Sequence, residues 1–169
     1  MTFSSKVSDC LTIREMSLND CWIGTMCSAD AKSYASWSLS SYEGMLAGLR
    51  TRGYVAEFEG VPAGVVMFSV MESTATIRIH QIAVSPPFRR RGVGKSLAYS
   101  VLGLMREGFS AKCTVPEDDL RAHLFLSRIG FVAVSRGGRY LTQGHIEFVA
   151  AYHEEMDFVS WKNGCRANE

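Results

Sequence analysis

Three consecutive arginines stand directly before a glycine pair in the segment Arg89-Arg90-Arg91-Gly92-Val93-Gly94. If a helix begins here, its first backbone N–H groups and the positive end of its dipole favour a bound anion. Glycines let the backbone approach a pyrophosphate closely, and arginines add charge-assisted hydrogen bonds. The segment therefore predicts a phosphate site formed by backbone N–H groups from about Arg90 to Lys95.

The flanking residues have the pattern that such a site requires. The range 76–84 is apolar enough for a buried strand and ends at Pro86-Pro87, because proline cannot donate to a sheet ladder. The range 92–107 predicts a helix that Gly108 closes. Its apolar face comprises Val93, Leu97, Val101 and Leu104.

Two known phosphate motifs do not fit the segment. A dinucleotide-binding Gly-x-Gly-x-x-Gly needs a third glycine where Leu97 stands. A nucleotide P-loop needs a glycine where Arg89 stands, although Gly94-Lys95-Ser96 matches its end. A nucleic-acid patch is disfavoured by the formal net charge of +1 and by the lack of interleaved aromatic residues.

The remaining pattern predicts one α/β domain with a mixed sheet and helices on both faces. Helices are expected from Asn19 or Asp20 to about Tyr34, from Ser40 or Ser41 to about Leu49, and from Asp118 or Asp119 to Gly130. The other expected strands are 10–14, 54–59, 63–71, 111–115, 131–135 and 145–152. The Glu59-Gly60 turn joins a hairpin, and the apolar run after it predicts a strand covered on both faces.

Composition limits the classes of protein to which the chain can belong. Its 169 residues suffice for one domain, placed at 8–158 with a tail at 159–169. Five cysteines without Cys-x-x-Cys spacing favour free thiols in a reducing compartment. We find no signal peptide and no apolar stretch of membrane-spanning length, which by elimination predicts a cytoplasmic protein.

With the strand, the glycine-rich loop and the helix in this order along the chain, the sequence resembles the GNAT superfamily of acetyl-CoA-dependent N-acetyltransferases. Arg89–Gly94 matches the family's Gln/Arg-x-x-Gly-x-Gly/Ala loop, and Leu124–Phe131 resembles its signature ending in Gly-Phe. The layout from Trp37 onward is similar to the branch that acetylates protein N-termini, such as ribosomal-protein alanine acetyltransferase. The strong match covers about 63–134.

The resemblance implies a single GNAT-like domain with a mostly antiparallel sheet of six to seven strands. It also implies a set of cofactor contacts, with Ile82-Ala83-Val84 pairing with the pantetheine arm and the loop holding the pyrophosphate. Asp119 aligns with an asparagine that often contacts the cofactor. The implied cofactor-binding residues are Ile82, Ala83, Val84, Arg89, Arg90, Arg91, Gly92, Val93, Gly94, Lys95 and Asp119.

The catalytic positions of the family are not matched. Leu126 stands where many members have a tyrosine that protonates the leaving thiolate, and Thr114 stands where the N-terminal branch has a carboxylate or histidine. His80 is the substitute that we predict, since strand alternation places it on the face of Ile82. Tyr140 is a second candidate.

Three further residues weigh on this choice. Tyr152 is another possible source of a hydroxyl, Arg78 is interpreted as a binder of acidic substrate, and Cys113 as a small buried hydrophobe. The histidines other than His80 lack metal spacing.

The sequence thus predicts acetyl transfer from acetyl-CoA to an amine within a ternary complex, without a metal, nucleic acid or membrane. Peptide α-amine, lysine, polyamine, amino acid and antibiotic all remain open as acceptors. An acyl-CoA-binding sensor without turnover is the alternative, motivated by Leu126 and Thr114, and DNA binding through Arg89–Arg91 is a third reading. Exposed apolar residues on the last strand would permit a homodimer.

Overall fold

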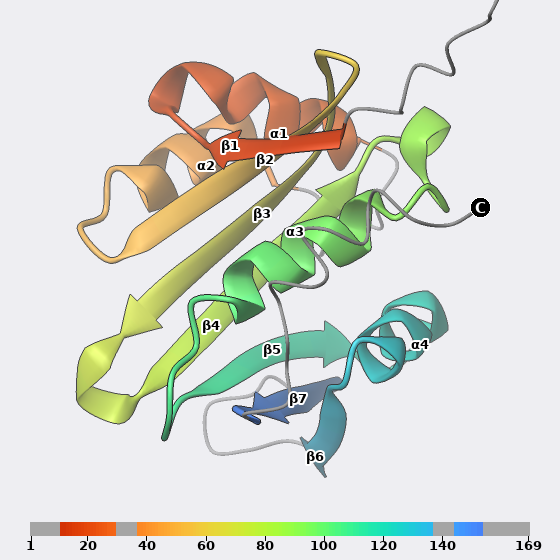
Figure 1. Ribbon diagram of the computed structural model, residues 1–169. Coiled ribbons are helices and arrows are strands. Elements are labelled where there is room, and N and C mark those ends of the chain that lie inside the picture. Colours follow the sequence, from red (N-terminus) through yellow and green to blue (C-terminus); the bar gives the residue numbers. More distant parts are fainter. Residues whose placement is uncertain (1–10, 30–36, 137–143, 154–169) are drawn as a thin grey trace, which may run out of the picture.

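The computed structural model describes residues 11–29, 37–136 and 144–153, which form a seven-stranded sheet in the order β1-β2-β3-β4-β5-β7-β6 (Figure 1). The strands are β1 (Leu11–Glu15), β2 (Thr51–Phe58), β3 (Val61–Met71), β4 (Thr76–Val84), β5 (Ser110–Pro116), β6 (Val132–Arg136) and β7 (His145–Ala151). Only the central β4–β5 pair is parallel among these neighbours. The predicted α/β fold with a mixed, mostly antiparallel sheet is confirmed.

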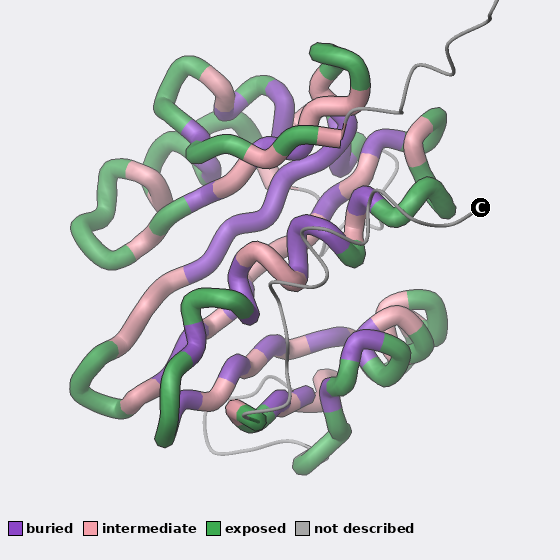
Figure 2. Tube along the Cα trace, in the orientation of Figure 1, coloured by how far each residue is buried: buried purple, intermediate pink, exposed green. Residues whose placement is uncertain are grey.

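Helices cover both faces of this sheet, as predicted. They are α1 (Cys21–Cys27), α2 (Leu39–Leu46), α3 (Val93–Leu102) and α4 (Leu120–Arg128). One core packs α1 and α2 on the sheet through Ile23, Tyr42 and Met67, and the other packs α3 and α4 through Leu97 and Leu126. Figure 2 shows β3 buried along its middle, where it lies between the two cores.

The β2–β3 hairpin has the predicted two-residue turn. Phe58 pairs with Val61, and the intervening Glu59 and Gly60 have φ values of 51° and 78°. Two successive residues with positive φ give the turn a twist that matches the strands, and glycine adopts this conformation without strain. The turn chemistry was therefore readable from the sequence.

Helices α1 to α4 all end earlier than predicted, and the difference is largest for α1 and α3. Helix α3 ends at Leu102 rather than at Glu107, and Gly103 caps it. The chain then turns so that Met105 and Phe109 enter the core, whereas the predicted face residue Leu104 is 38% exposed. Helix α1 ends at Cys27, where the Ser28 hydroxyl donates to the Gly24 carbonyl. Residues 30–36, the end of the predicted first helix, lie outside the described residues.

The edge strand that could pair with a second copy is β6, not the last strand of the chain, β7. Strand β7 lies inside the sheet between β5 and β6, so β6 forms the edge and exposes Val132 and Val134. An exposed edge permits pairing with another chain, and the homodimer stays a prediction. The predicted tail lies outside the described residues.

The cysteines and helices of the described residues agree with two further expectations. Cys21, Cys27 and Cys113 are buried free thiols. No helix in the described ranges is both long and apolar enough to cross a membrane.

Candidate functional site

The central feature of the site is a split between β4 and β5. Their ladder joins Thr76–Ile79 to Ser110–Cys113 and then stops, although β4 continues to Val84 and β5 to Pro116. Figure 1 shows the two strands diverging beyond this point, with α3 following one and α4 the other. Strand backbone has polar groups that require partners. The split edge of β4 can therefore pair with an extended ligand.

A β-bulge marks the start of the split. Met67 of β3 pairs with Gln81, and the adjacent Phe68 pairs with Ile79, so His80 is the extra residue. A bulge changes the alternation of side chains. The prediction that His80 shares a face with Ile82 is wrong, because Ile82 packs against the core under α3 and α4, whereas His80 bonds to a hydroxyl on the other face.

The arginine-glycine segment leads into a helix start, as the sequence indicated. Arg90 has φ of 62°, and Gly92, with φ of 80°, is the residue before α3. The first helical hydrogen bond runs from the Ser96 N–H to the Gly92 carbonyl. The N–H groups of residues 93–95 therefore lie outside the helical ladder, where they can donate to an anion.

Packing does not explain the glycine at position 94. A Cβ built on Gly94 would lie 3.5 Å from the Phe125 ring and 3.5 Å from Val84 Cγ2, which is ordinary contact. A Cβ on Gly64, by contrast, would lie 2.9 Å from the Ala83 carbonyl oxygen. Gly64 thus serves strand-to-helix packing, whereas Gly94 leaves room at a helix start. This fits a pyrophosphate approaching the backbone.

The three arginines are held differently. Arg89 Nε donates to the Val84 carbonyl at 3.0 Å, at the end of the split strand. The Arg91 guanidinium lies 5.5 Å from the centre of the Phe58 ring. All three side chains are exposed, as is Lys95, whose ammonium lies 5.4 Å from the Tyr99 ring. The loop therefore presents several cations beside the free N–H groups.

Helix α4 approaches the loop through an apolar residue. Phe125, half-buried, lies beside Gly94 and Val84, and sequence reasoning did not single it out. Leu126 is 3% exposed in the core. Asp119 caps the helix by accepting a hydrogen bond from the Ala122 N–H at 3.1 Å. Its predicted cofactor contact stays a prediction.

Charged and polar side chains of β4, β5 and β7 lie close together near the point where β4 and β5 separate. Arg78 donates from Nη1 to Thr114 Oγ1 at 3.5 Å, and its Nη2 lies 3.7 Å from Glu147 Oε1. Thr114 and Glu147 are direct partners on β5 and β7. A carboxylate thus stands one strand away from Thr114. The sequence contained no signal for it, because strand register decides which residue faces Thr114.

His80 occupies the bulge as a neutral base. Its Nε2 lies 2.7 Å from Ser69 Oγ. Burial, and then the positive charge of Arg78, lower the pKa of His80 below its usual 6.5. At neutral pH the imidazole is therefore uncharged and can accept a proton.

A buried tyrosine ties α2 to the residue after the bulge. The Tyr42 hydroxyl donates to Gln81 Oε1, and burial raises the pKa of Tyr42 to about 12. Its ring packs so closely on Gly24 that a Cβ there would lie 2.4 Å away. Tyr42 and Gln81 were missed by sequence reasoning. The helical pair α1–α2 thereby contacts the start of the split directly.

The structure also bears on the other residues that the sequence analysis considered. Tyr140 lies outside the described residues. Tyr152 packs half-buried against the α3–α4 core. Burial raises the pKa of the Cys113 thiol to about 12, which agrees with its interpretation as a small buried hydrophobe. No group of three potential metal ligands occurs among the described residues, and the absence of a metal stays a prediction.

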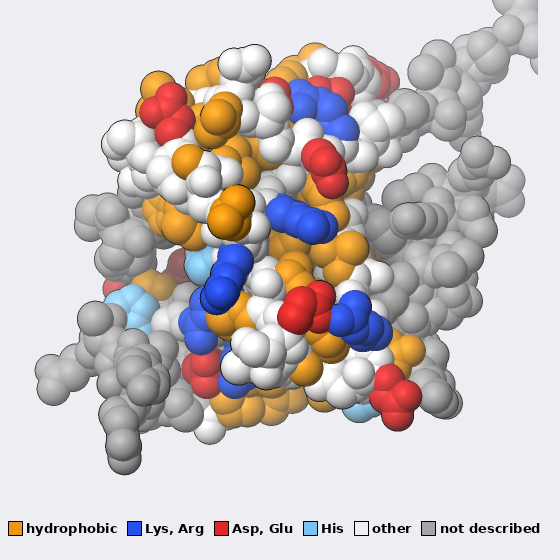
Figure 3. Space-filling model, turned by 90° about the vertical axis from the view of Figure 1, so that its left-hand side faces the viewer, with side chains coloured by type: hydrophobic (Ala, Val, Ile, Leu, Met, Phe, Trp, Pro, Cys, Tyr) orange, Lys and Arg blue, Asp and Glu red, His pale blue; other side chains and the backbone are white. Residues whose placement is uncertain are grey.

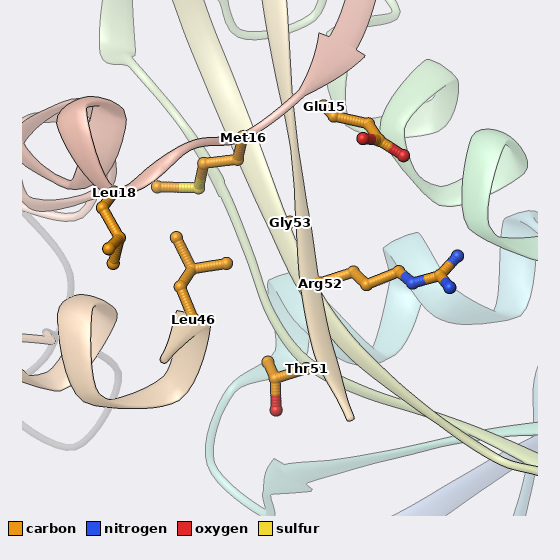
Figure 4. A pocket seen from close by; sticks show the side chains of 7 residues that line it. All are labelled: Glu15, Met16, Leu18, Leu46, Thr51, Arg52 and Gly53. Atoms are coloured by element: carbon orange, nitrogen blue, oxygen red, sulfur yellow. The ribbon is translucent and has the colours of Figure 1, made fainter. Parts of the chain in front are cut away.

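A hollow of about 360 Å³ lies apart from the split, at the β1–β2 edge (Figure 4). Met16, Leu18 and Leu46 line it on the side of α1 and α2, whereas Glu15 and Arg52 extend toward the opposite side of the strands. Thr51 lies at its end. The residues that line this hollow belong neither to the part of β4 beyond its ladder with β5 nor to the start of α3.

The part of the sequence that forms the split and the glycine-rich helix start lies within a match to a known family. The model of the acetyltransferase (GNAT) family matches residues 18–131. The chain belongs to the GNAT acetyltransferase family. A search of curated protein sequences finds no match to this GNAT protein.

Solved structures share the fold of this GNAT protein. Ard1 from Thermoplasma volcanium is 24% identical with a TM-score of 0.72, covering 85% of this chain and 99% of that one. The ribosomal-protein-S18-alanine N-acetyltransferase from Escherichia coli is 19% identical with a TM-score of 0.70, covering 87% and 98%. Naa50 from Arabidopsis thaliana, in complex with the bisubstrate analogue CoA-Ac-MVNAL, is 17% identical with a TM-score of 0.68, covering 86% and 100%.

Proposed function

We propose that this protein transfers an acetyl group from acetyl-CoA to the α-amine of a peptide or protein N-terminus. The observation that carries the proposal is the split between β4 and β5, with the glycine-rich start of α3 at its open end. The names of two similar structures support a protein or peptide acceptor: one is a ribosomal-protein-S18-alanine N-acetyltransferase, and the other is Naa50 in complex with the bisubstrate analogue CoA-Ac-MVNAL.

The loop and the split strand fit the two ends of the acetyl-CoA molecule. The N–H groups of residues 93–95 and the exposed arginines suit the pyrophosphate, and the part of β4 beyond its ladder with β5 suits the amide-containing pantetheine arm. Acetyl-CoA, when bound, supplies the acetyl group as an activated thioester. The residues of this chain then have to orient the acceptor amine and receive its proton.

The bases available at the site favour a weakly basic acceptor. An α-amine has a pKa of about 7.7–8.0 and a lysine of about 10.4, so about one α-amine in eight is neutral at pH 7, against about one lysine in 2500. The described part of the site offers His80, whose pKa is lowered, and Glu147, which faces Arg78. Weak bases suffice for an amine that is already partly neutral.

The charge at the acceptor side is nearly balanced. Arg78 alone would attract acidic acceptors, as the sequence suggested. Glu147 lies 3.7 Å from its guanidinium and offsets that charge. We therefore expect no marked preference for acceptors with acidic residues near the reacting amine.

The proposal is tested by titrating the protein with acetyl-CoA and then following thiol release with a panel of amines. The panel contains short peptides with free N-termini, the same peptides with blocked N-termini and a free lysine, spermidine and single amino acids. We expect saturable acetyl-CoA binding and release that is fastest with free peptide N-termini. Tight binding without thiol release from any amine would instead indicate a sensor.

A further inference from the structure

Two hydroxyl residues extend from His80 across the neighbouring strands. Ser69 Oγ on β3 lies 2.7 Å from His80 Nε2 and 3.1 Å from Thr51 Oγ1 on β2. Thr51 and Ser69 are direct partners in the β2–β3 ladder, so their side chains share a face. The three half-buried side chains form one hydrogen-bonded row over three strands, called here the hydroxyl row.

The hydroxyl row lies on the face that α1 and α2 cover, where its neighbours on β2 and β3 are mainly apolar and Gln81 of β4 bonds to Tyr42. Its neighbours on the same face include Val55, Val65 and Met67, which are fully buried in the core under α1 and α2. Half-buried polar groups in such surroundings are costly unless they are paired. The charged group that faces His80 is Arg78 on its own strand, with Glu147 of β7 beyond the guanidinium.

The direction of the hydrogen bonds in this row decides which ring nitrogen of His80 can act as a base. If Nε2 carries the proton, it donates to Ser69 Oγ, and the Ser69 hydroxyl donates in turn to Thr51 Oγ1. Nδ1 then keeps a free lone pair. In the opposite direction Ser69 would donate to Nε2, and Nδ1–H would be unable to accept a proton.

We propose that Ser69 and Thr51 are positioning residues that hold His80 as its Nε2–H tautomer, with Nδ1 as the nitrogen that accepts the acceptor's proton. This inference rests on the proposed function. In the step it describes, the N–H bond of the acceptor ammonium breaks and an Nδ1–H bond forms. The nitrogen keeps the electron pair as a neutral amine, and the imidazolium, still bonded to Ser69, releases the proton to water.

The tautomer is measured directly by ¹⁵N NMR of the full chain labelled at histidine, with His80→Gln assigning the signals. We expect Nε2–H in the wild type and in Thr51→Ser, which keeps the hydroxyl. Ser69→Ala is expected to shift the His80 signals toward the tautomer mixture of a free imidazole, and Thr51→Val to shift them part of the way. An Nδ1–H tautomer in the wild type, or unchanged signals in Ser69→Ala, overturns the proposal.

Kinetics supply the second readout. Ser69→Ala is expected to lower kcat about tenfold, part of the effect of a general base, with acetyl-CoA Kd unchanged. In the His80→Gln background the same change should have no further effect, because the residues act as one unit. Ser100→Ala, which removes a helix hydroxyl bonded to the Ser96 carbonyl, is the matched control. Equal losses from Ser69→Ala with and without His80 contradict the proposal.

The two measurements separate this inference from the proposed function. If the wild type releases no thiol with any amine, the proposed function fails, while the NMR signals still decide whether the hydroxyl row sets the tautomer. If thiol release is normal but the tautomer is Nδ1–H, only the positioning role is overturned. Melting temperatures of all variants show whether each remains folded.

Discussion

At the scale of single residues, the candidate site differs from its sequence expectation in which groups surround His80 and Thr114. His80 was identified from the sequence, but its neighbours Ser69 and Thr51 were not, because they follow from the pairing of β2, β3 and β4. Glu147 was missed for the same reason. Residue type can suggest a base, whereas its partners are set by strand register.

The lowered pKa of His80 predicts how turnover responds to acid. Since burial and Arg78 lower this pKa from 6.5, more than half of the imidazole is neutral at pH 6.5, and the midpoint of the fall in kcat should lie below pH 6.5. Arg78→Gln removes the nearby positive charge, which raises the pKa, so the falling limb of kcat should move to higher pH. The check is kcat against pH at saturating substrates, and an unmoved limb in Arg78→Gln argues against His80 as the base.

Glu147 predicts the charge preference of the acceptor. In Glu147→Gln the charge of Arg78 is no longer offset. Both side chains are partly exposed, and two unit charges about 4 Å apart in water interact by about 1 kcal/mol. The kcat/KM ratio of acidic to neutral peptides should therefore rise about fivefold. Glu57→Gln is the matched control, since Glu57 also pairs with an arginine and its side chain is 23% exposed, against 22% for Glu147. Equal ratios in both variants would disprove this role.

At the scale of elements, the glycine-rich start of α3 was predictable and the bulge in β4 was not. The loop has local signals, because Gly92 adopts positive φ and the helix face repeats at a regular interval. The bulge at His80 has none, because it depends on how β4 pairs with β3. The early end of α3 follows from Met105 and Phe109 reaching the core, which periodicity alone does not reveal.

Two glycine substitutions test the role of the α3 start. Gly94→Asp should leave the melting temperature unchanged or raise it, because its Cβ has room and a carboxylate in the first turn complements the helix dipole. The same carboxylate should repel the pyrophosphate and weaken acetyl-CoA binding at least tenfold, measured by calorimetry.

Gly64→Ala is the control for Gly94→Asp, because Gly64 is required for packing rather than for ligand binding. Its Cβ would meet the Ala83 carbonyl at 2.9 Å, so the free energy of unfolding should fall by about 1–3 kcal/mol. A loss of stability in Gly94→Asp, or full acetyl-CoA affinity in that folded variant, would mean that the glycine serves packing rather than anion binding.

At the scale of the whole molecule, the site arises where the sheet divides. The element order was predictable from the sequence, since each strand and helix has its own pattern. The divergence of β4 from β5 was not, because it involves strands joined through α3 and a backbone ladder that stops after Ile79 and Cys113. The family resemblance named residues for the cofactor site without describing this geometry, and their contacts with acetyl-CoA stay a prediction.

The distribution of charge predicts the response to nucleic acid. Basic and acidic side chains are interspersed on the face shown in Figure 3, and the formal net charge is +1. Arg89→Ala combined with Arg90→Ala should weaken acetyl-CoA binding by a few kcal/mol at most, because the backbone donors remain. DNA binding with a steep salt dependence that this variant loses would support a nucleic-acid role instead.

The most direct measurement uses one peptide that contains both a free α-amine and a lysine. After incubation with the protein and acetyl-CoA, fragment mass spectrometry locates the acetyl group while thiol release is quantified in the same sample. We predict one acetyl group on the α-amine, with one thiol released per peptide modified. Acetylation of the lysine with an untouched α-amine, or saturable acetyl-CoA binding without any modified peptide, would contradict the proposed function.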